Sequence, residues 1–391
     1  MKKIFIYVIA VTTFLFSFSS SFSQTDSCNL RISLLTCSPG EELYSTFGHT
    51  ALRVTDASNG MDFVFNYGTF DDRDPDFYPK FTRGLMLYAL SAYPFSDFVQ
   101  EYREEGRGVE EQVLQLSCAQ KQALFNALRE NAQEQNRFYY YYFHTDNCTT
   151  RARDMVLKST GNTVSFKNIL PEKIPSFRNL IHEYLDKGHE PWSKFGIDIL
   201  LGANLDKKVT NETAMFLPDY LMKGFDNATV AGKPLVGAKQ TVLSISAKPE
   251  SSGSWFTPFV LFTVLFVFIT LLSILKPRWS GTFLRVFDIS FFLLLGLLGT
   301  LLAVLWMIRV DTVCRNNYNM QWALPFHLLV AFFIPGRKLW VRKYFSVVCI
   351  LTISLAAWWF AIPQQLNPAI APLLGVILVR AYCLSRKPKE L

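Results

Sequence analysis

The chain divides into two stretches with different hydrophobic patterns. In the first, up to about residue 250, short apolar runs at Leu30–Leu35, Thr50–Val54 and Phe63–Tyr67 are typical of strands. Ala119–Glu134 and Arg151–Lys158 instead repeat apolar residues at helical spacing. We therefore predict an α+β domain over residues 24–231.

The second stretch, from Phe256 onward, is dominated by long apolar runs. They predict an all-α membrane domain over residues 255–385 with about five transmembrane helices. The five candidate spans are Phe256–Leu275, Phe287–Ile308, Trp322–Pro335, Tyr344–Ile362 and Ala369–Leu384. The third and fifth are short and contain Pro325, Pro335 and Pro372, so we expect them to be kinked or tilted.

Charged residues orient these spans. Lysine and arginine cluster after the first and third spans and in the tail at residues 386–391, which indicates that these sides are cytoplasmic. At the other end, Lys2 and Lys3 precede an apolar run that ends before Ser21-Phe22-Ser23, so residues 1–23 are predicted to be a signal peptide. Residues 232–254, with little periodicity, are predicted to be a linker.

These patterns predict a multi-pass protein of the inner (cytoplasmic) membrane with its first domain on the periplasmic side. The formal net charge of +7 comes largely from the flanks of the spans. We therefore expect a membrane partner and no nucleic-acid partner. The sequence leaves the oligomeric state open.

Two short motifs suggest chemistry. Asn147-Cys148 places a cysteine at the start of a predicted helix, directly after a capping residue, and Gly48-His49 places a histidine at the head of a strand. A helix N-terminus and a nearby imidazolium both favour the thiolate, which is the nucleophilic form of cysteine. We therefore predict that Cys148 is a nucleophile and that His49 is its base.

The order of these motifs suggests a fold. A papain-like core has its cysteine helix before its histidine strand, whereas here the histidine strand comes first. This predicts a circularly permuted papain-like domain related to NlpC/P60. In that architecture the strand after the histidine carries a polar residue that orients the imidazole. Asn66 is the first candidate and Asp71 the second. His144 is an alternative base by residue type, but it lies four residues before Cys148 and is expected to flank the site.

Further candidates concern substrate binding and cross-linking. Arg53, Tyr67, Asn147 and His327 are candidate substrate contacts, although structural roles are open for each. We predict no metal and no cofactor, because the histidines lack ligand spacing. If Cys148 stays free, the other exported cysteines, Cys28, Cys37 and Cys118, allow at most one disulfide.

The chain resembles the Lnb-type lipoprotein N-acyltransferases, formerly a domain of unknown function. The resemblance rests on residues 32–40, 44–54 and 146–151, with weaker similarity at 65–68, 216–219 and 319–325. It implies that an acyl chain moves from a phospholipid, through a thioester on Cys148, to the α-amino group of a diacylglyceryl-cysteine lipoprotein. The implied partners are therefore a phospholipid donor, a lipoprotein acceptor and the membrane.

Two other classes of function remain open from the residues. The first is an exported papain-like cysteine amidase or peptidase acting on cell-wall or peptide substrates, which would favour an open polar groove. The second is a membrane-anchored binding module without catalysis. Acyl transfer would instead require an apolar slot beside His49 and Cys148 that faces the bilayer.

Overall fold

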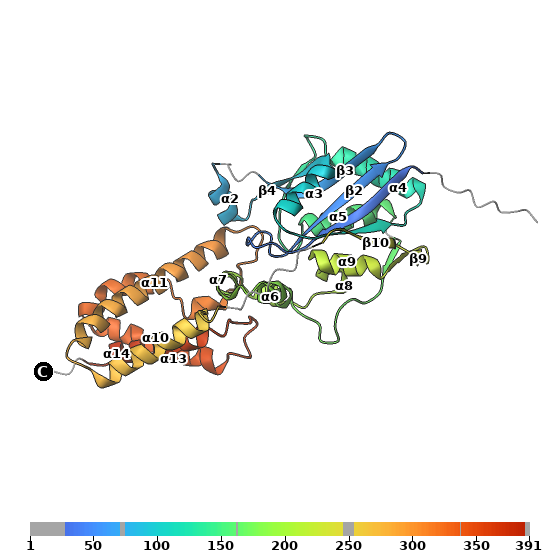
Figure 1. The fold of residues 1–391 in the computed structure, drawn as a ribbon. Helices are drawn as coiled ribbons and strands as arrows, with labels where there is room; N and C mark the ends of the chain where they lie inside the picture. The colour runs from blue at the N-terminus through green and yellow to red at the C-terminus, as the bar shows by residue number, and fades with distance from the viewer. Residues whose placement is uncertain (1–27, 71–74, 162, 245–253, 337, 388–391) are drawn as a thin grey trace, which may run out of the picture.

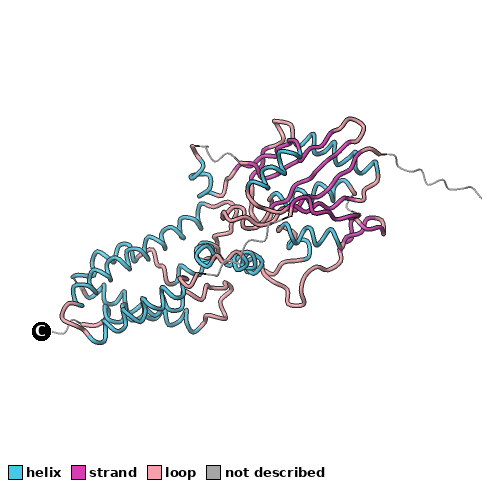
Figure 2. Tube along the Cα trace, viewed as in Figure 1, coloured by secondary structure: helices cyan, strands magenta, loops and turns pink. Residues whose placement is uncertain are grey.

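The computed structural model describes residues 28–70, 75–161, 163–244, 254–336 and 338–387 (Figure 1). The predicted signal peptide, Asp71 and parts of the predicted linker and tail lie outside these residues. Figure 2 shows strands gathered in one unit, and a second unit built only of helices and loops. The division into an α+β domain and a helical domain is therefore confirmed.

A seven-stranded antiparallel sheet forms the centre of the first unit, in the order β10-β5-β1-β2-β3-β4-β6. Its strands are β1 Leu30–Cys37, β2 His49–Asp56, β3 Met61–Thr69, β4 Leu87–Pro94, β5 Val109–Leu114, β6 Phe138–Tyr140 and β10 Val236–Leu243. A smaller sheet contains β7 Val164–Phe166, β8 Ala228–Val230 and β9 Lys233–Pro234.

Helices cover both faces of the large sheet. On one face, α3 (Phe95–Glu104) packs Phe98 against Ala51 and Val64. On the other, α4 (Cys118–Asn131), α5 (Cys148–Ser159) and α9 (Pro218–Asp226) pack against alternate residues of the same strands, such as Leu52 and Phe65. Because side chains alternate along a strand, the central strands are buried on both faces.

The remaining helices of this unit are not among those that cover the large sheet, and some of them lie near the membrane unit. They are α2 Phe77–Arg83, α6 Phe177–Lys187, α7 Pro191–Leu200, η1 Ala203–Asp206 and α8 Asn211–Ala214. Figure 1 shows α2 beside the end of α11, and α6 and α7 between the two units.

The prediction that residues 232–254 form a linker was wrong for Val236–Leu243. These residues form β10, which pairs with β5 and completes one edge of the large sheet. Most of its side chains are exposed, so the strand lacks the apolar alternation that marks a half-buried strand. Backbone pairing with β5, which the sequence does not display, decides its structure.

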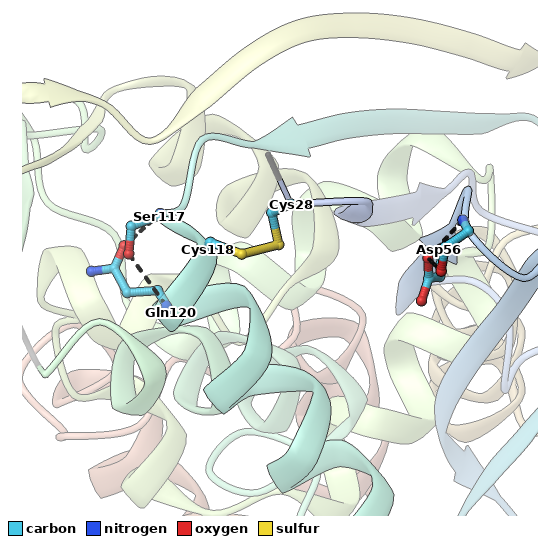
Figure 3. The surroundings of a disulfide bond; sticks show 6 residues. Cys28, Asp56, Ser117, Cys118 and Gln120 are labelled. Atoms are coloured by element: carbon cyan, nitrogen blue, oxygen red, sulfur yellow. Dashed lines mark hydrogen bonds between the residues drawn. A yellow bond between two sulfur atoms is a disulfide. The ribbon is translucent and has the colours of Figure 1, made fainter. Parts of the chain in front are cut away.

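One disulfide forms between Cys28 and Cys118, whose Cα atoms are 5.4 Å apart. Figure 3 shows the bond at the start of α4, beside the capping pair of Ser117 and Gln120. It ties the residues before β1 to a helix that follows 90 positions later in the chain. Cys37 and Cys148 stay free, as a nucleophilic role for Cys148 requires.

Among the residues that the structure describes, three helices of the helical unit are long and apolar enough to cross a membrane: α10 Pro258–Leu275, α11 Ser280–Ile308 and α13 Leu339–Ala357. They coincide with the first, second and fourth predicted spans. The fifth corresponds to the shorter α14, Ile370–Ser385. Three of the five spans are thus confirmed as long helices, and the number five stays a prediction.

The third predicted span, Trp322–Pro335, is not one continuous helix. The 3₁₀ turn η2 (Tyr318–Gln321) precedes it, and it contains the four-residue α12, His327–Val330, followed by η3, Ala331–Gly336. Its backbone packs directly on Gly296 and Gly299 of α11, where no side chain would fit. Irregular backbone at membrane depth is tolerated when protein covers it in this way.

A buried polar joint fastens the two units together. Asp198 of α7 has no exposed surface; Arg178 and His182 donate to it at 2.9 and 2.7 Å. From the membrane unit, the Asn367 amide donates to its second oxygen at 2.8 Å.

Two more amides from the membrane unit reach the end of α7. Asn317 donates to the carbonyls of Ile199 and Leu200, and Asn319 donates to those of Asp198 and Ile199, over 2.7–3.1 Å. The last carbonyls of a helix have no partner within it. At α7 the other unit supplies those partners, so the joint is satisfied only when the units are docked.

We expect Asp198→Ala to destabilise the protein strongly, because the buried Arg178 keeps Asp206 as its remaining carboxylate partner while His182 and the Asn367 amide lose theirs. Removing one member of a buried pair costs about 3–5 kcal/mol. Thermal unfolding of the detergent-solubilised protein should show a marked fall in Tm. As a control, Asp186→Ala removes only an exposed pair with Lys194, and its Tm should stay within about 2 °C. Equal Tm values for the two variants would contradict the importance of the joint.

Candidate active site

Cys148 is the first residue of α5, and Asn147 fixes the turn before it. The Asn147 side chain accepts from the Thr150 backbone N–H at 2.8 Å, and the Thr150 hydroxyl accepts from the Asn147 N–H at the same distance. The Asn147 amide nitrogen donates to the carbonyls of Phe143 and Phe216. This reciprocal cap holds the cysteine at the helix N-terminus. Asn147 thus positions Cys148, with both ends of its amide bonded.

His49 begins β2, and Asn66 lies on the neighbouring β3. His49 Nε2 and Asn66 Oδ1 are 2.6 Å apart. Because an amide oxygen only accepts, Nε2 carries the proton, and Nδ1 is the ring nitrogen available to the thiol. Asn66 in turn donates to the Tyr93 hydroxyl at 2.8 Å, which keeps its oxygen directed at the imidazole.

The thiol of Cys148 is buried and hydrogen-bonded to His49. Burial alone would raise its pKa, but the charge of His49, with hydrogen bonds from His49, the Thr50 backbone and Thr149, lowers it from 9.0 to about 7. The pKa of His49 shifts in the opposite sense. Burial would lower it, yet the thiolate charge and the hydrogen bonds to Cys148 and Asn66 raise it. The two shifts together favour a thiolate–imidazolium pair.

Gly68 lies against both reacting side chains, and its role was missed by the sequence analysis. A Cβ atom here would lie 3.5 Å from Cβ of Cys148 and 3.6 Å from Cε1 of His49. The residue has a φ of +99°, and the pairing of β3 with β4 shifts register beside it. Glycine is favoured at such a φ, and a bulge near a reactive pair is a common way to aim side chains.

Two cavities meet at Cys148. The first, of about 240 Å³, runs from Cys148 to Arg309 and Asp311, just beyond the end of α11. Its wall is mainly apolar and aromatic, and includes Phe47, Phe81, Met86, Phe143, Phe216 and Leu217. We refer to it as the apolar pocket.

The second cavity, of about 420 Å³, lies on the His49 side of the thiol. Its lining is richer in polar groups, and includes His49, Asn66, Ser91, Tyr93, Glu101 and Arg107. We refer to it as the polar pocket. The nucleophile therefore stands between an apolar and a polar compartment.

The structure does not bring Arg53 and Tyr67 to the thiol. Arg53 pairs with Asp62 through two hydrogen bonds of 2.8 and 2.7 Å and also with Glu111, and it lines neither pocket. Tyr67 is buried in the core and donates to Asn131 at 2.9 Å. Protein groups thus already satisfy the polar atoms of Arg53 and Tyr67, and a substrate contact by either residue stays a prediction.

The two remaining histidine candidates also lie apart from the pair. His327 is buried in the membrane unit, 2.9 Å from the Tyr344 hydroxyl, and lines neither pocket, so its proposed substrate contact has no support. His144 packs on the ring of Phe177 and lines neither pocket, in agreement with a flanking position. Within the described residues, no group of three or more potential ligands could hold a metal ion.

The pair predicts a distinct pH profile for the reactivity of Cys148. Alkylation by iodoacetamide should rise with pH through a midpoint near 7, because the thiolate forms above its pKa. His49→Ala removes the imidazolium while burial remains, so the midpoint should move above 9. Asn66→Ala should move it less, since it only weakens the support for imidazolium. A wild-type midpoint above 9 would contradict the ion pair.

Comparison with known protein families agrees with the two-unit architecture. Residues 18–183 match the Lnb N-terminal periplasmic domain, and residues 249–389 match the Lnb transmembrane domain. No curated protein and no solved structure matches the chain, so the permuted papain-like fold stays a prediction. With both domains present in this order, the chain belongs to the Lnb family.

Proposed function

We propose that the protein is a lipoprotein N-acyltransferase of the inner membrane, with its catalytic domain on the periplasmic side. It would take an acyl chain from a phospholipid, hold it as a thioester on Cys148, and pass it to the α-amino group of a diacylglyceryl-cysteine lipoprotein. The observation that carries this proposal is the apolar pocket, which joins the thiol to the outer end of α11. An acyl chain needs such a slot, and a cell-wall peptide does not.

The first half-reaction forms the thioester. The Cys148 thiolate attacks the ester carbonyl carbon, and the backbone N–H of Cys148, which has no acceptor within α5, stabilises the oxyanion. As the carbon–oxygen bond breaks, the His49 imidazolium gives its proton to the departing alcohol. A lysophospholipid leaves, and the acyl group stays on sulfur.

The second half-reaction releases the acyl chain as an amide. The lipoprotein amine attacks the thioester carbonyl, neutral His49 accepts a proton from the nitrogen, and the carbon–sulfur bond breaks to restore the thiolate. The leaving alcohol and the incoming amine must use the same side of the acyl carbon. The polar pocket lies on the His49 side of the thiol and suits that purpose.

A second candidate, a cysteine amidase or peptidase, finds support in the polar pocket itself. Its mixed lining could accept a peptide. In a hydrolase acting on polar substrates, however, the apolar pocket would have no role. A non-catalytic binding module would likewise give no use to a thiol whose pKa is lowered to about 7.

We expect Cys148→Ala to abolish N-acylation, because no other group in the pair can form the thioester. Mass spectrometry of lipoprotein N-terminal peptides should show the mass of a third acyl chain in cells with the wild-type protein and its loss with the variant. Cys37→Ala is a matched control: Cys37 is also a buried free thiol, but burial raises its pKa to about 12. It should retain most of the activity.

The amidase would be favoured if wild-type cells lacked the third acyl chain and instead showed cleaved wall peptides. A binding module would be favoured if Cys148→Ala left the biological role of the protein intact.

We expect His49→Ala to reduce acyl transfer by at least about 10²-fold, the scale of general-base catalysis. His144→Ala should keep activity within a few-fold, since His144 lines neither pocket. Initial rates of lysophospholipid release by the purified variants, in vesicles that also contain a diacylglyceryl-cysteine lipopeptide as acceptor, would measure both effects. The opposite ranking of the two histidines would show that the base is wrongly assigned.

A further inference from the structure

The short helix α2 exposes aromatic side chains close to the membrane unit. Tyr78 is 78% exposed and Phe81 is 56% exposed, and residues three apart on a helix lie side by side, so the two rings form one uncovered patch. In Figure 1, α2 stands beside the end of α11. The position suggests that the covering partner is the bilayer.

Specific contacts hold α2 to the end of α11. Arg309 donates to the Phe81 carbonyl at 2.9 Å, and the Val310 N–H donates to the Arg83 carbonyl at 3.1 Å. Gly84 caps α2 with a φ of +68°, and a Cβ atom there would lie only 3.1 Å from the Asp311 carboxylate. The helix is therefore fixed where α11 emerges.

An apolar surface continues from α11 across α2 into the active site. Met307 and Val310 are exposed near the end of α11, and Phe81 is exposed on α2. Phe81 also lines the apolar pocket, as do the exposed side chains of Leu43 and Tyr44. A chain moving from the lipid-facing side of α11 to Cys148 would thus pass mainly apolar side chains, with the paired Arg309 and Asp311 beside its entry.

We propose that α2 lies in the headgroup region of the adjacent leaflet and forms one wall of a lateral portal for phospholipid acyl chains. This inference rests on the proposed function and adds the route of the donor. A lipid surface is favoured over a protein partner because the patch is continuous with the predicted membrane-spanning surface of α11. Tyrosine and phenylalanine beside lysine and arginine also suit the membrane interface.

Tyr78→Asp tests the portal. An acidic residue is compatible with the first turn of a helix, which holds none in α2, so the change should alter the surface without unfolding the helix. The assay uses vesicles of phosphatidylethanolamine and phosphatidylglycerol that also contain a diacylglyceryl-cysteine lipopeptide, so that the thioester turns over. We expect the rate of lysophospholipid release, divided by the rate of hydrolysis of soluble p-nitrophenyl butyrate, to fall at least about tenfold. Tyr78→Trp should preserve the ratio within about twofold.

Phe63→Asp is the matched control. Phe63 is an exposed aromatic residue near the start of β3, whereas Gly68, which lies against the reactive pair, is near the end of that strand. Its ratio should equal that of the wild type. A benzophenone amino acid at position 78 should also form a covalent lipid adduct in the same vesicles, including in a Cys148→Ala background. The same probe at position 63 should form none.

The outcomes separate the two proposals. If the wild-type protein releases no lysophospholipid, the proposed function fails. If it does, an unchanged ratio in Tyr78→Asp, the absence of a lipid adduct at position 78, or an adduct with a protein instead of a lipid each overturns the portal.

Discussion

The arrangement of this protein depends on the burial of one carboxylate, Asp198. An ion with no exposed surface must be paired on every side, because its desolvation costs several kcal/mol. Arg178 and His182 supply partners from the exported unit, and Asn367 supplies one from the membrane unit. Neither unit satisfies the carboxylate alone, so their docking is a condition of stability. The apolar pocket, which draws its wall from both units, depends on that docking.

Within the site, two opposing effects act on one thiol. Burial disfavours the charge on Cys148, and the charge of His49 together with three hydrogen bonds favours it. The effects that favour the charge prevail, because Asn66 holds His49 in place and the Asn147 cap holds the cysteine. Cys37 shows the alternative outcome: it is equally buried, lacks a histidine partner, and has its pKa raised to about 12. Position beside an oriented imidazole, and not burial, distinguishes the reactive thiol.

The sequence predicted the parts of the site that rest on local signals. A capping residue before Cys148, a glycine before His49 and a polar residue on the next strand are each visible within a few positions. The hydrogen-bond partners of Arg53 and Tyr67 were not foreseen, because strand pairing and packing bring Asp62, Glu111 and Asn131 to them. Likewise β10 was missed, since an exposed edge strand depends on its neighbour. The break of the third span reflects backbone contact with Gly296 and Gly299, which no hydropathy pattern reveals.

The two-unit design also bears on the energy of the proposed reaction. Moving an acyl chain of about fourteen methylenes from lipid into water would cost roughly 11 kcal/mol, at about 0.8 kcal/mol for each. A catalytic domain merely tethered above the bilayer would add that cost to its barrier. A pocket whose mouth is fixed at the end of α11 avoids it, because the chain exchanges one apolar surface for another. The joint at Asp198 is therefore more than an anchor: in the proposed reaction it keeps Cys148 within reach of a substrate that water would not deliver.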